Sequence, residues 1–355
     1  MGRRRHPGVS VAMPSETHID KPLLELIQAR FPLVRQPYAQ VAAEIGCGEQ
    51  ELLARLKELR GTNGIIREIS AIFSAFALGY SQSLIALQQG QADLDKAGRI
   101  VSEHPGVSHC YERDGRYNLW FTLAVSPQSC FGLAGTVEVL ARATGAEAKL
   151  ILPAIKRYKL RFDPGFLSDN GPDRAISPET LDREQPPALT DAMIRSVRSL
   201  QKDLPNQQDP FAVLARKSDL DPDMLLVHAA DLLAGGYMRR YAAVLHHRRA
   251  GAQANVMVAW LVETSSADRA GAEAARFPAV SHCYIRETCE DWPYALYTMI
   301  HGSSRENCLH TIDRIASATG LSDRQELWTL KEYKKQRVRF FTGGESAWEG
   351  KAERR

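Results

Sequence analysis

The sequence predicts an α+β protein in which one two-domain unit occurs twice. A short stretch is duplicated almost unchanged: residues 106–113 read GVSHCYER, and residues 279–286 read AVSHCYIR. Helical and strand periods follow one another in the same order around each copy, which is the pattern of an internal duplication. A stretch rich in Pro, Asp and Ser, 163–188, separates the two units and predicts a linker.

The duplicated stretch contains five identical residues in a row, Val-Ser-His-Cys-Tyr. The simplest interpretation is that duplication copied a structural strand with Val and Tyr in the core. A His–Cys–Tyr triplet is an unusual choice for a strand that only packs, because strands favour β-branched and aromatic residues. We therefore treat His109 and its counterpart His282 as candidate functional residues.

Each unit begins with three short amphipathic helices that lead into a turn and an extended run. Such a succession, closed by a hairpin, predicts a winged helix-turn-helix domain. We place these domains at 19–80 and 189–250. The expected helices are residues 21–30, 40–45 and 49–59 in the first copy, and 192–202, 211–216 and 224–233 in the second.

The second part of each unit has the order βαββαβ, which predicts a ferredoxin-like sandwich with helices on one face of an antiparallel sheet. We expect the two sandwiches at 81–162 and 251–341, paired with each other because one chain holds them at high effective concentration. Residues 1–18 and 342–355 are expected to be flexible tails. The expected elements of the first sandwich are the strands 83–87, 107–113, 118–125 and 149–153 and the helices 91–103 and 132–144.

Composition excludes several classes of protein. The net charge of +3 over 355 residues is too small for a polycation built to bind nucleic acid. The basic start of the chain is not followed by an apolar run of signal-peptide length, and no apolar stretch is long enough to span a membrane. We therefore expect a cytoplasmic protein. The six cysteines contain no Cys-x-x-Cys pair, so they predict reduced thiols rather than a metal site.

The helices that would read DNA carry the wrong charge for that role. In the first copy, the recognition helix, 48–60, has two glutamates at the end that would meet base edges. The second copy, 221–236, has three aspartates and no Lys or Arg. Because an anionic helix repels the phosphates of the major groove, we expect no nucleic-acid binding.

Positive charge gathers instead in three other runs: 155–162, 333–340 and 239–249. In an extended chain alternate residues share a face, so Lys159 should point with Arg161, and Arg337 with Arg339. One such run alone is typical of an edge strand protected against aggregation. Three of them, beside a duplicated His–Cys–Tyr strand, predict a pocket for a polyanion, and Arg is suited to bind several carboxylates at once.

The residues around the two histidines resemble a known family. The segments 107–121 and 279–302 are similar to the two subunit types of the siroheme decarboxylases, and 239–247 is similar to the wing of the second type. The resemblance covers nearly the whole chain outside the tails and linker, and it implies that both subunit types are joined in one polypeptide. It also implies the Lrp/AsnC-like regulator fold and an enzyme that removes CO2 from the C12 and C18 acetates of siroheme, giving 12,18-didecarboxysiroheme in heme d1 biosynthesis.

This substrate agrees with the distribution of charge. Siroheme carries eight carboxylates on a flat macrocycle, so its site needs several cations around an aromatic slot. The resemblance implies siroheme and its monodecarboxylated intermediate as ligands, and it leaves room for a homodimer and for contacts with neighbouring enzymes of the heme d1 pathway. No cofactor is expected, because the pyrrole of the substrate can accept the electrons left by CO2 and the iron arrives with the substrate.

The candidate proton donors are His109, His282 and His247, since His titrates near neutral pH; one of them could instead ligate the iron. The first wing lacks the basic cluster of the second, so a single catalytically complete half is an alternative to two. The candidate substrate-binding residues are Arg239, Arg240, Arg337, Arg339, Lys334, Lys159, Arg161, Tyr111, Tyr284, Tyr294 and Trp292.

Two other functions stay open on the sequence alone. One is a ligand-binding transcription regulator of the Lrp/AsnC kind, against which the acidic recognition helices argue. The other is a tetrapyrrole carrier without turnover, because binding and decarboxylation require the same pocket.

Overall fold

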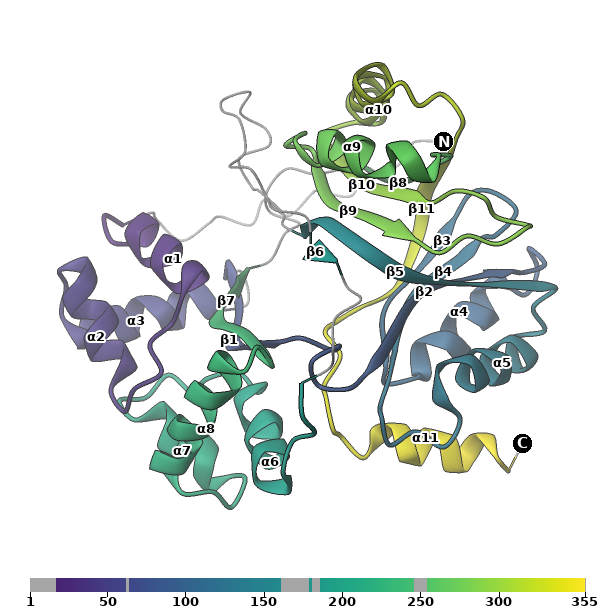
Figure 1. Cartoon of the computed structure of the whole chain (residues 1–355). Helices are drawn as coiled ribbons and strands as arrows, with labels where there is room; N and C mark the ends of the chain where they lie inside the picture. Colours follow the sequence, from purple (N-terminus) through teal and green to yellow (C-terminus); the bar gives the residue numbers. More distant parts are fainter. Residues whose placement is uncertain (1–16, 62–63, 161–178, 181–185, 246–253, 355) are drawn as a thin grey trace, which may run out of the picture. The chain divides into compact units, whose positions relative to one another are not determined.

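The computed structural model describes residues 17–61, 64–160, 179–180, 186–245 and 254–354. The chain forms two compact units, and each unit contains like domains from both halves of the sequence (Figure 1). Residues 1–74 and 188–246 form the helix-turn-helix unit, and residues 75–187 and 247–355 form the sheet unit. Most of the expected linker and of the N-terminal tail lies outside the described residues.

The helix-turn-helix unit contains two sets of three helices, as the sequence predicts. Pro at the first turn begins α2, α7 and α8, and the side chains of Asp209 and Asp221 cap the last two by accepting backbone N–H bonds. The elements are α1 Asp20–Ala29, α2 Pro37–Ile45, α3 Glu49–Arg60 and β1 Ile66–Phe73, then α6 Asp191–Leu200, α7 Pro210–Arg216, α8 Pro222–Ala234 and β7 Met238–Leu245.

The hairpin expected within each of these domains is wrong. Among the described residues each copy contributes one strand, and β1 pairs antiparallel with β7 in a register that places Ser70 opposite Ala242. Backbone N–H and C=O groups of a buried strand need partners, and the duplicated strand supplies them. Pairing therefore joins the two helix-turn-helix domains rather than completing each one separately.

The sheet unit confirms the βαββαβ order in both halves. Strand β3 and helix α5 have the expected bounds, β5 extends beyond its expected end to Leu160, and the other ends of the first sandwich shift by at most three residues. The first half contains β2 Ser81–Gln88, α4 Leu94–Glu103, β3 Val107–Arg113, β4 Leu119–Val125, α5 Gly132–Thr144 and β5 Ala148–Leu160. The second contains β8 Ala254–Trp260, α9 Thr264–Ala275, β9 Val280–Arg286, β10 Leu296–Gly302, α10 Arg305–Thr319 and β11 Arg324–Lys335.

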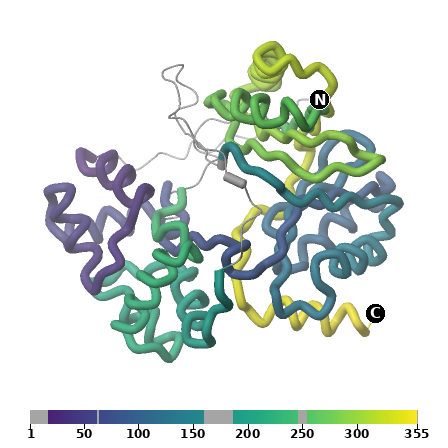
Figure 2. Tube along the Cα trace, in the orientation of Figure 1, coloured from purple at the N-terminus to yellow at the C-terminus, as the bar shows by residue number. Residues whose placement is uncertain are grey.

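The two sandwiches are paired, as expected, and they exchange their last strands. The first half of β5 pairs with β2 of its own sandwich, and its second half pairs with β9 of the other, a path that Figure 2 shows in teal. Strand β11 does the same with β8 and β3. Eight of the described strands therefore close into a ring in the order β2, β4, β3, β11, β8, β10, β9, β5, and the short β6, Glu179–Thr180, adds to β5.

The ring has two sides with different cores. Helices α4 and α5 cover one sandwich and α9 and α10 the other, each over its own apolar cluster. The opposite side, which we call the inner face, is lined by residues of both sandwiches that form a third cluster. Its buried members are Leu84, Ala86, Tyr117, Trp120, Leu150, Leu152, Met257, Ala259, Trp292, Tyr297 and Leu327.

A duplicated set of contacts holds each exchanged strand on the helix of the other sandwich. Lys156 Nζ donates to Asp268 Oδ1 at 2.7 Å, and the Tyr158 hydroxyl donates to the same carboxylate. The Tyr158 ring lies against Gly271, where a Cβ would approach it to 2.5 Å. We call this arrangement, a Lys-x-Tyr strand on an Asp-x-x-Gly helix, the latch.

The second latch repeats the first in reverse. Lys331 and Tyr333 of β11 donate to Asp95 of α4, and the Tyr333 ring lies against Gly98. Ion pairing and hydrogen bonding lower the pKa of both aspartates, whereas burial raises the pKa of both tyrosines. The ring closes only when each sandwich receives the end of a strand from the other, so the two sandwiches depend on each other.

The expected flexible tail after Phe341 is wrong, because residues Gly344–Ala352 form helix α11. Trp348 packs edge-on against the buried His104 with 4.4 Å between ring centroids. Glu345 accepts a hydrogen bond from the Ser126 backbone N–H, and Glu349 accepts one from the Ser129 hydroxyl. The segment is polar in sequence, but these tertiary contacts, which no local pattern announces, bury its carboxylates.

The latch predicts a graded response to a single added methyl group. Gly271→Ala should lower the free energy of unfolding by about 1–3 kcal/mol, the usual cost of overpacking, because the Tyr158 ring is 1% exposed and cannot withdraw. Gly98→Ala should cost less, since Tyr333 is only half-buried. Gly90→Ala, with no neighbour within 4 Å of the new methyl, is the control. Urea unfolding measures all three; equal stabilities would contradict the latch.

Candidate functional site

The two His–Cys–Tyr strands share a local irregularity that orients their side chains. A register shift between Val107 and His109 makes Ser108 a β-bulge, and the pairing of β9 with β10 likewise omits Ser281. Bulges bend a strand and re-aim its side chains, and they are frequent beside active sites. Here the bulge puts a serine hydroxyl next to each histidine, as described below.

Alternation along these strands separates cysteine from histidine. Cys110 and Cys283 are completely buried in the helix-covered cores. Burial raises the pKa of the Cys110 thiol to about 12 and also raises that of Cys283, so both remain protonated at neutral pH. The cysteines are core residues and not nucleophiles.

The remaining residues of each strand face the inner side as a stripe of His, Tyr and Arg. His109, Tyr111 and Arg113 form the first stripe, and His282, Tyr284 and Arg286 form the second. In each stripe the guanidinium lies over the tyrosine ring, at 5.3 Å in the first and 5.0 Å in the second. The ring of strands thus carries two equivalent polar stripes beside one aromatic cluster.

The two arginines of these stripes are not among the site residues that the sequence predicts. Arg113 donates to the Leu327 carbonyl at 2.8 Å, and Arg286 donates to the Leu152 carbonyl at 2.9 Å, each across to an exchanged strand. Burial lowers the pKa of both, to about 10 for Arg113, which leaves them charged at neutral pH. Within the described residues neither forms an ion pair with a carboxylate. The signal in the sequence was an Arg four residues after each duplicated His.

The two histidines have different surroundings. His109 Nδ1 lies 2.9 Å from Ser108 Oγ, and His282 Nδ1 lies 2.7 Å from Ser281 Oγ. Only in the second stripe does the serine continue to another histidine, because Ser281 Oγ is 2.8 Å from His301 Nε2. The register makes Trp120, opposite Tyr111, equivalent to Tyr297, opposite Tyr284. Counting along β4 and β10 from these two residues, the equivalent of His301 in the first half is Ala124.

The predicted lysines lie on the other side of the sheet. Lys159 Nζ donates to the Phe277 carbonyl after α9, and Lys334 Nζ donates to the carbonyls of Ser102 and His104 at the end of α4. Both therefore satisfy carbonyl groups at helix C-termini, a position that favours cations. Their assignment to the substrate is at odds with this placement.

Bulges determine the side of the sheet on which these two lysines lie. Register shifts occur between Arg157 and Lys159 on β5, and between Glu332 and Lys334 on β11. Each shift turns the following lysine to the helix-covered side. Arg157 pairs with Tyr284 on the inner face, where the first stripe has Glu332 opposite Tyr111, so the charge beside the two tyrosines is opposite in sign.

The other predicted cations are distributed over different segments. Arg239 and Arg240 are exposed on β7 of the helix-turn-helix unit. Strand β11 ends at Lys335, so Arg337 and Arg339 lie beyond the strand on which their alternation was expected. Arg337 is half-buried and Arg339 is exposed. Arg161 and His247 lie outside the described residues.

The predicted aromatic residues divide into core and surface. Trp292 is 6% exposed, packs 5.7 Å from the Tyr117 ring and donates to the Tyr297 hydroxyl, so it is a core residue of the inner face. Tyr294 is half-buried and accepts a hydrogen bond from Gln325. Tyr111 and Tyr284, also half-buried, stay beside the histidines, with ring centroids 6.1 and 6.5 Å from them.

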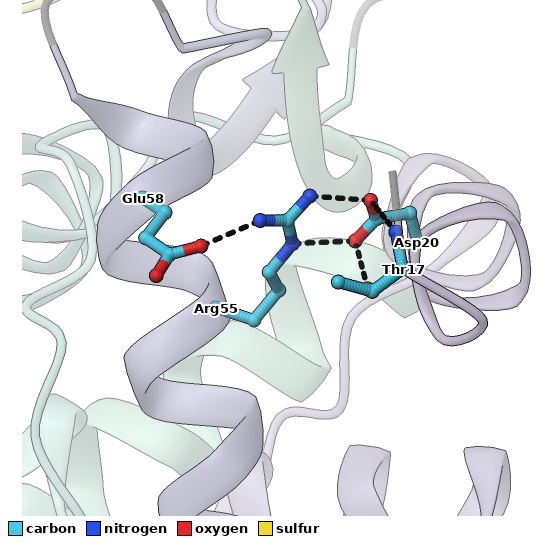
Figure 3. A network of polar contacts seen from close by, with 4 residues as sticks. All are labelled: Thr17, Asp20, Arg55 and Glu58. Carbon is cyan, nitrogen blue, oxygen red and sulfur yellow. Dashed lines mark hydrogen bonds and ion pairs between the residues drawn. The ribbon is translucent and has the colours of Figure 1, made fainter. Parts of the chain in front are cut away.

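The recognition helix of the first domain uses its cations internally. Arg55 of α3 is 6% exposed and donates to both carboxylate oxygens of Asp20, at 2.6 and 2.5 Å, and to Glu58 (Figure 3). Arg60 donates to the Leu204 carbonyl. Hydrogen bonding to Arg55 lowers the pKa of the Asp20 carboxyl to about 2. Two of the three cations of this helix are therefore engaged within the unit, and its counterpart α8 contains none.

Two negative findings apply to the described ranges only. No group of three or more His, Cys, Asp or Glu side chains in them is arranged to hold a metal ion. None of the helices they contain combines the length and apolar character that crossing a membrane requires.

Comparison with known families matches both kinds of domain. A family described as an AsnC-like ligand-binding domain matches residues 77–159 and 249–334, which are the two sandwiches. A family described as the siroheme decarboxylase NirDL-like helix-turn-helix domain matches residues 20–67.

Individual relatives match over nearly the whole chain. A siroheme decarboxylase of Hydrogenobacter thermophilus is 34% identical over 326 residues, which are 92% of this chain and 96% of the relative. A siroheme decarboxylase beta subunit of Oleidesulfovibrio alaskensis is 38% identical over 43% of this chain and 98% of its own length. The crystal structure of the siroheme decarboxylase NirDL in complex with an iron-uroporphyrin III analogue superposes with a TM-score of 0.79 at 30% identity, covering 94% of this chain and 98% of that one.

The Asp20–Arg55 pair makes a prediction about pH. Because the pKa of Asp20 falls from 3.8 to about 2 on folding, its stabilisation is present above pH 3.8 and is lost as the pH falls from 3.8 towards 2. Asp20→Asn should cost about 3 kcal/mol at pH 7 by leaving a buried charge poorly paired, and much less near pH 2. Hydrogen exchange of α1 and α3 measures the difference, and a cost independent of pH would refute the assignment.

Proposed function

The chain belongs to the siroheme decarboxylase family, and we propose that it removes CO2 from the C12 and C18 acetate groups of siroheme to give 12,18-didecarboxysiroheme in heme d1 biosynthesis. The observation that supports this best is the duplicated His–Tyr–Arg stripe on one closed ring of strands. Two equivalent acid-bearing stripes suit a substrate on which the same reaction occurs at two places.

The reaction needs a proton and a poorly solvated carboxylate. The bond between the acetate methylene and its carboxylate breaks, CO2 leaves, and the pyrrole accepts the electron pair. A proton then adds to the methylene carbon, which becomes a methyl group. The protein supplies that proton, and histidine is the side chain that carries one near neutral pH. The reaction draws on no separate cofactor, since the iron arrives with the substrate.

His282 and His109 are the proposed proton donors. Each turns Nδ1 towards a serine, so Nε2, on the opposite side of the ring, is the nitrogen directed away from that contact. Tyr284 and Tyr111 lie beside them on the same face and offer ring surfaces to the macrocycle. His247 remains a third candidate, and iron ligation by one of the three is the alternative role for that residue.

Arginines hold the carboxylates that remain. Arg113 and Arg286 are fixed cations on the inner face, and the low dielectric around them strengthens their attraction for an anion. Arg239, Arg240, Arg337 and Arg339 are proposed to bind further carboxylates, for which the guanidinium fork is suited. Siroheme and the monodecarboxylated intermediate are the proposed ligands. A homodimer and contacts with neighbouring pathway enzymes stay predictions.

Transcription regulation is the second candidate, because an AsnC-like ligand-binding domain matches both sandwiches. The engaged arginines of α3 and the anionic α8 argue against it, since α3 leaves one exposed cation, Lys57, and α8 contains no Lys or Arg. We expect no sequence-dependent shift of duplex DNA at moderate salt. Sequence-dependent binding of duplex DNA at nanomolar protein concentration in a gel assay would support the regulator instead.

Product analysis tests the proposed function and the two histidines together. Anaerobic incubation with siroheme should give a product lighter by two CO2, and unchanged bound siroheme would instead identify a carrier. His109→Ala and His282→Ala should each lower turnover by roughly two to four orders of magnitude, the usual contribution of a positioned acid, while the arginines preserve binding.

The stage at which each variant stops tells the two stripes apart. If one variant accumulates the monodecarboxylated product, each histidine serves one acetate. His310→Ala, an exposed histidine on α10, is the matched control and should behave as wild type. Full activity in the His109/His282 double variant would remove both from the mechanism and leave His247.

A further inference from the structure

The second stripe contains a connected row of side chains that the first does not. Ser281 Oγ lies 2.7 Å from His282 Nδ1 and 2.8 Å from His301 Nε2, with the Met299 carbonyl farther away at 3.3 Å. Ser281 is 3% exposed, whereas both histidines are half-buried. A buried hydroxyl therefore joins two imidazoles that come from the adjacent strands β9 and β10.

The number of hydrogens at this junction restricts its arrangement. A serine hydroxyl donates one hydrogen and accepts two bonds, and a neutral imidazole has one N–H and one acceptor nitrogen. Ser281 can donate to only one histidine, so the other must donate to Ser281. If Ser281 donates to His282 Nδ1, then His301 Nε2–H donates to Ser281, and the proton of His282 resides on Nε2.

We propose that Ser281 and His301 are positioning residues that set the tautomer of His282 and resupply its proton, a route that the equivalent residues of the first stripe do not offer. This inference rests on the proposed function. When His282 Nε2 gives its proton to the methylene carbon, Nδ1 accepts the hydroxyl proton of Ser281. Ser281 in turn accepts the Nε2 proton of a protonated His301, which ends neutral and regains a proton from solvent.

The first stripe cannot use this route through the equivalent residues. Ser108 contacts His109 in the same way, but Ala124 stands where His301 would extend the row. His109 must therefore arrive already charged to leave a neutral ring behind. Duplication gave the two stripes the same strand, bulge and serine, and a single position on the neighbouring strand separates them chemically.

Substitution of His301 in the full-length chain tests the proposal. With siroheme as substrate, His301→Ala should lower kcat by roughly 10- to 100-fold, by analogy with the outer partners of metal-binding histidines, and leave KM unchanged because His301 acts through Ser281. The decarboxylation that depends on His282 should slow, and the one that depends on His109 should not. Added imidazole should restore part of the rate, since a small acid can then enter the space.

Two further variants separate relay from mere support. His301→Gln can still donate a hydrogen bond to Ser281 but is not an acid, so it should keep the fold and KM without restoring kcat. Ser281→Ala should resemble His301→Ala, and its matched variant Ser108→Ala should have a smaller effect because no relay passes through it. His310→Ala again serves as the control.

The outcomes distinguish the inference from the proposed function. A wild-type chain that forms no decarboxylated product overturns the function itself. A wild-type chain that forms product, beside a His301→Ala variant with the same kcat and product ratio, overturns only the inference. Full recovery with His301→Gln overturns the relay, because a hydrogen bond alone would then suffice.

Discussion

The exchange of the last strands is the constraint on which the sheet unit depends. Each sandwich pairs one of its strand edges with the end of a strand that begins in the other sandwich, and the latch fixes that end through Lys156 and Tyr158 on Asp268, with a mirror set on Asp95. The half-buried Arg286 adds a hydrogen bond to the same exchanged strand. Because the ring closes only through these contacts, the two polar stripes exist on one face only when both halves are present.

This dependence explains why a duplicated chain can diverge without losing its fold. The latch residues are alike in the two halves, whereas positions facing the inner side differ: Arg157 against Glu332, and His301 against Ala124. The latch residues hold the exchanged strands on the helices, and the residues that differ lie beside the polar stripes. The latch thus lies on the helix-covered side of these strands, and the residues that differ lie on the inner side.

Sequence predicted what depends on local pattern and missed what depends on distant contacts. The bounds of β3 and α5 follow from periodicity, and the histidines follow from the repeat. The pairing of β1 with β7 joins segments far apart in the chain, and α11 is held by Glu345 and Glu349, whose burial a polar sequence does not suggest. Lys159 and Lys334 lie on the helix-covered side because bulges reverse alternation, and the positions of bulges are not visible in composition.

The bulge at each serine is the detail that links this fold to its chemistry. In an unbroken strand, a residue next to an inward histidine points to the opposite face, and its hydroxyl would be enclosed by the helix-covered core. The extra residue breaks that alternation and leaves the serine beside its own histidine, at 2.9 Å in one half and 2.7 Å in the other. Both copies keep this geometry although only one continues it to a second histidine. The serine contact is therefore common to both halves, where it orients the histidine ring. The residue on the adjacent strand, His301 or Ala124, determines whether the histidine can be resupplied with a proton through that serine.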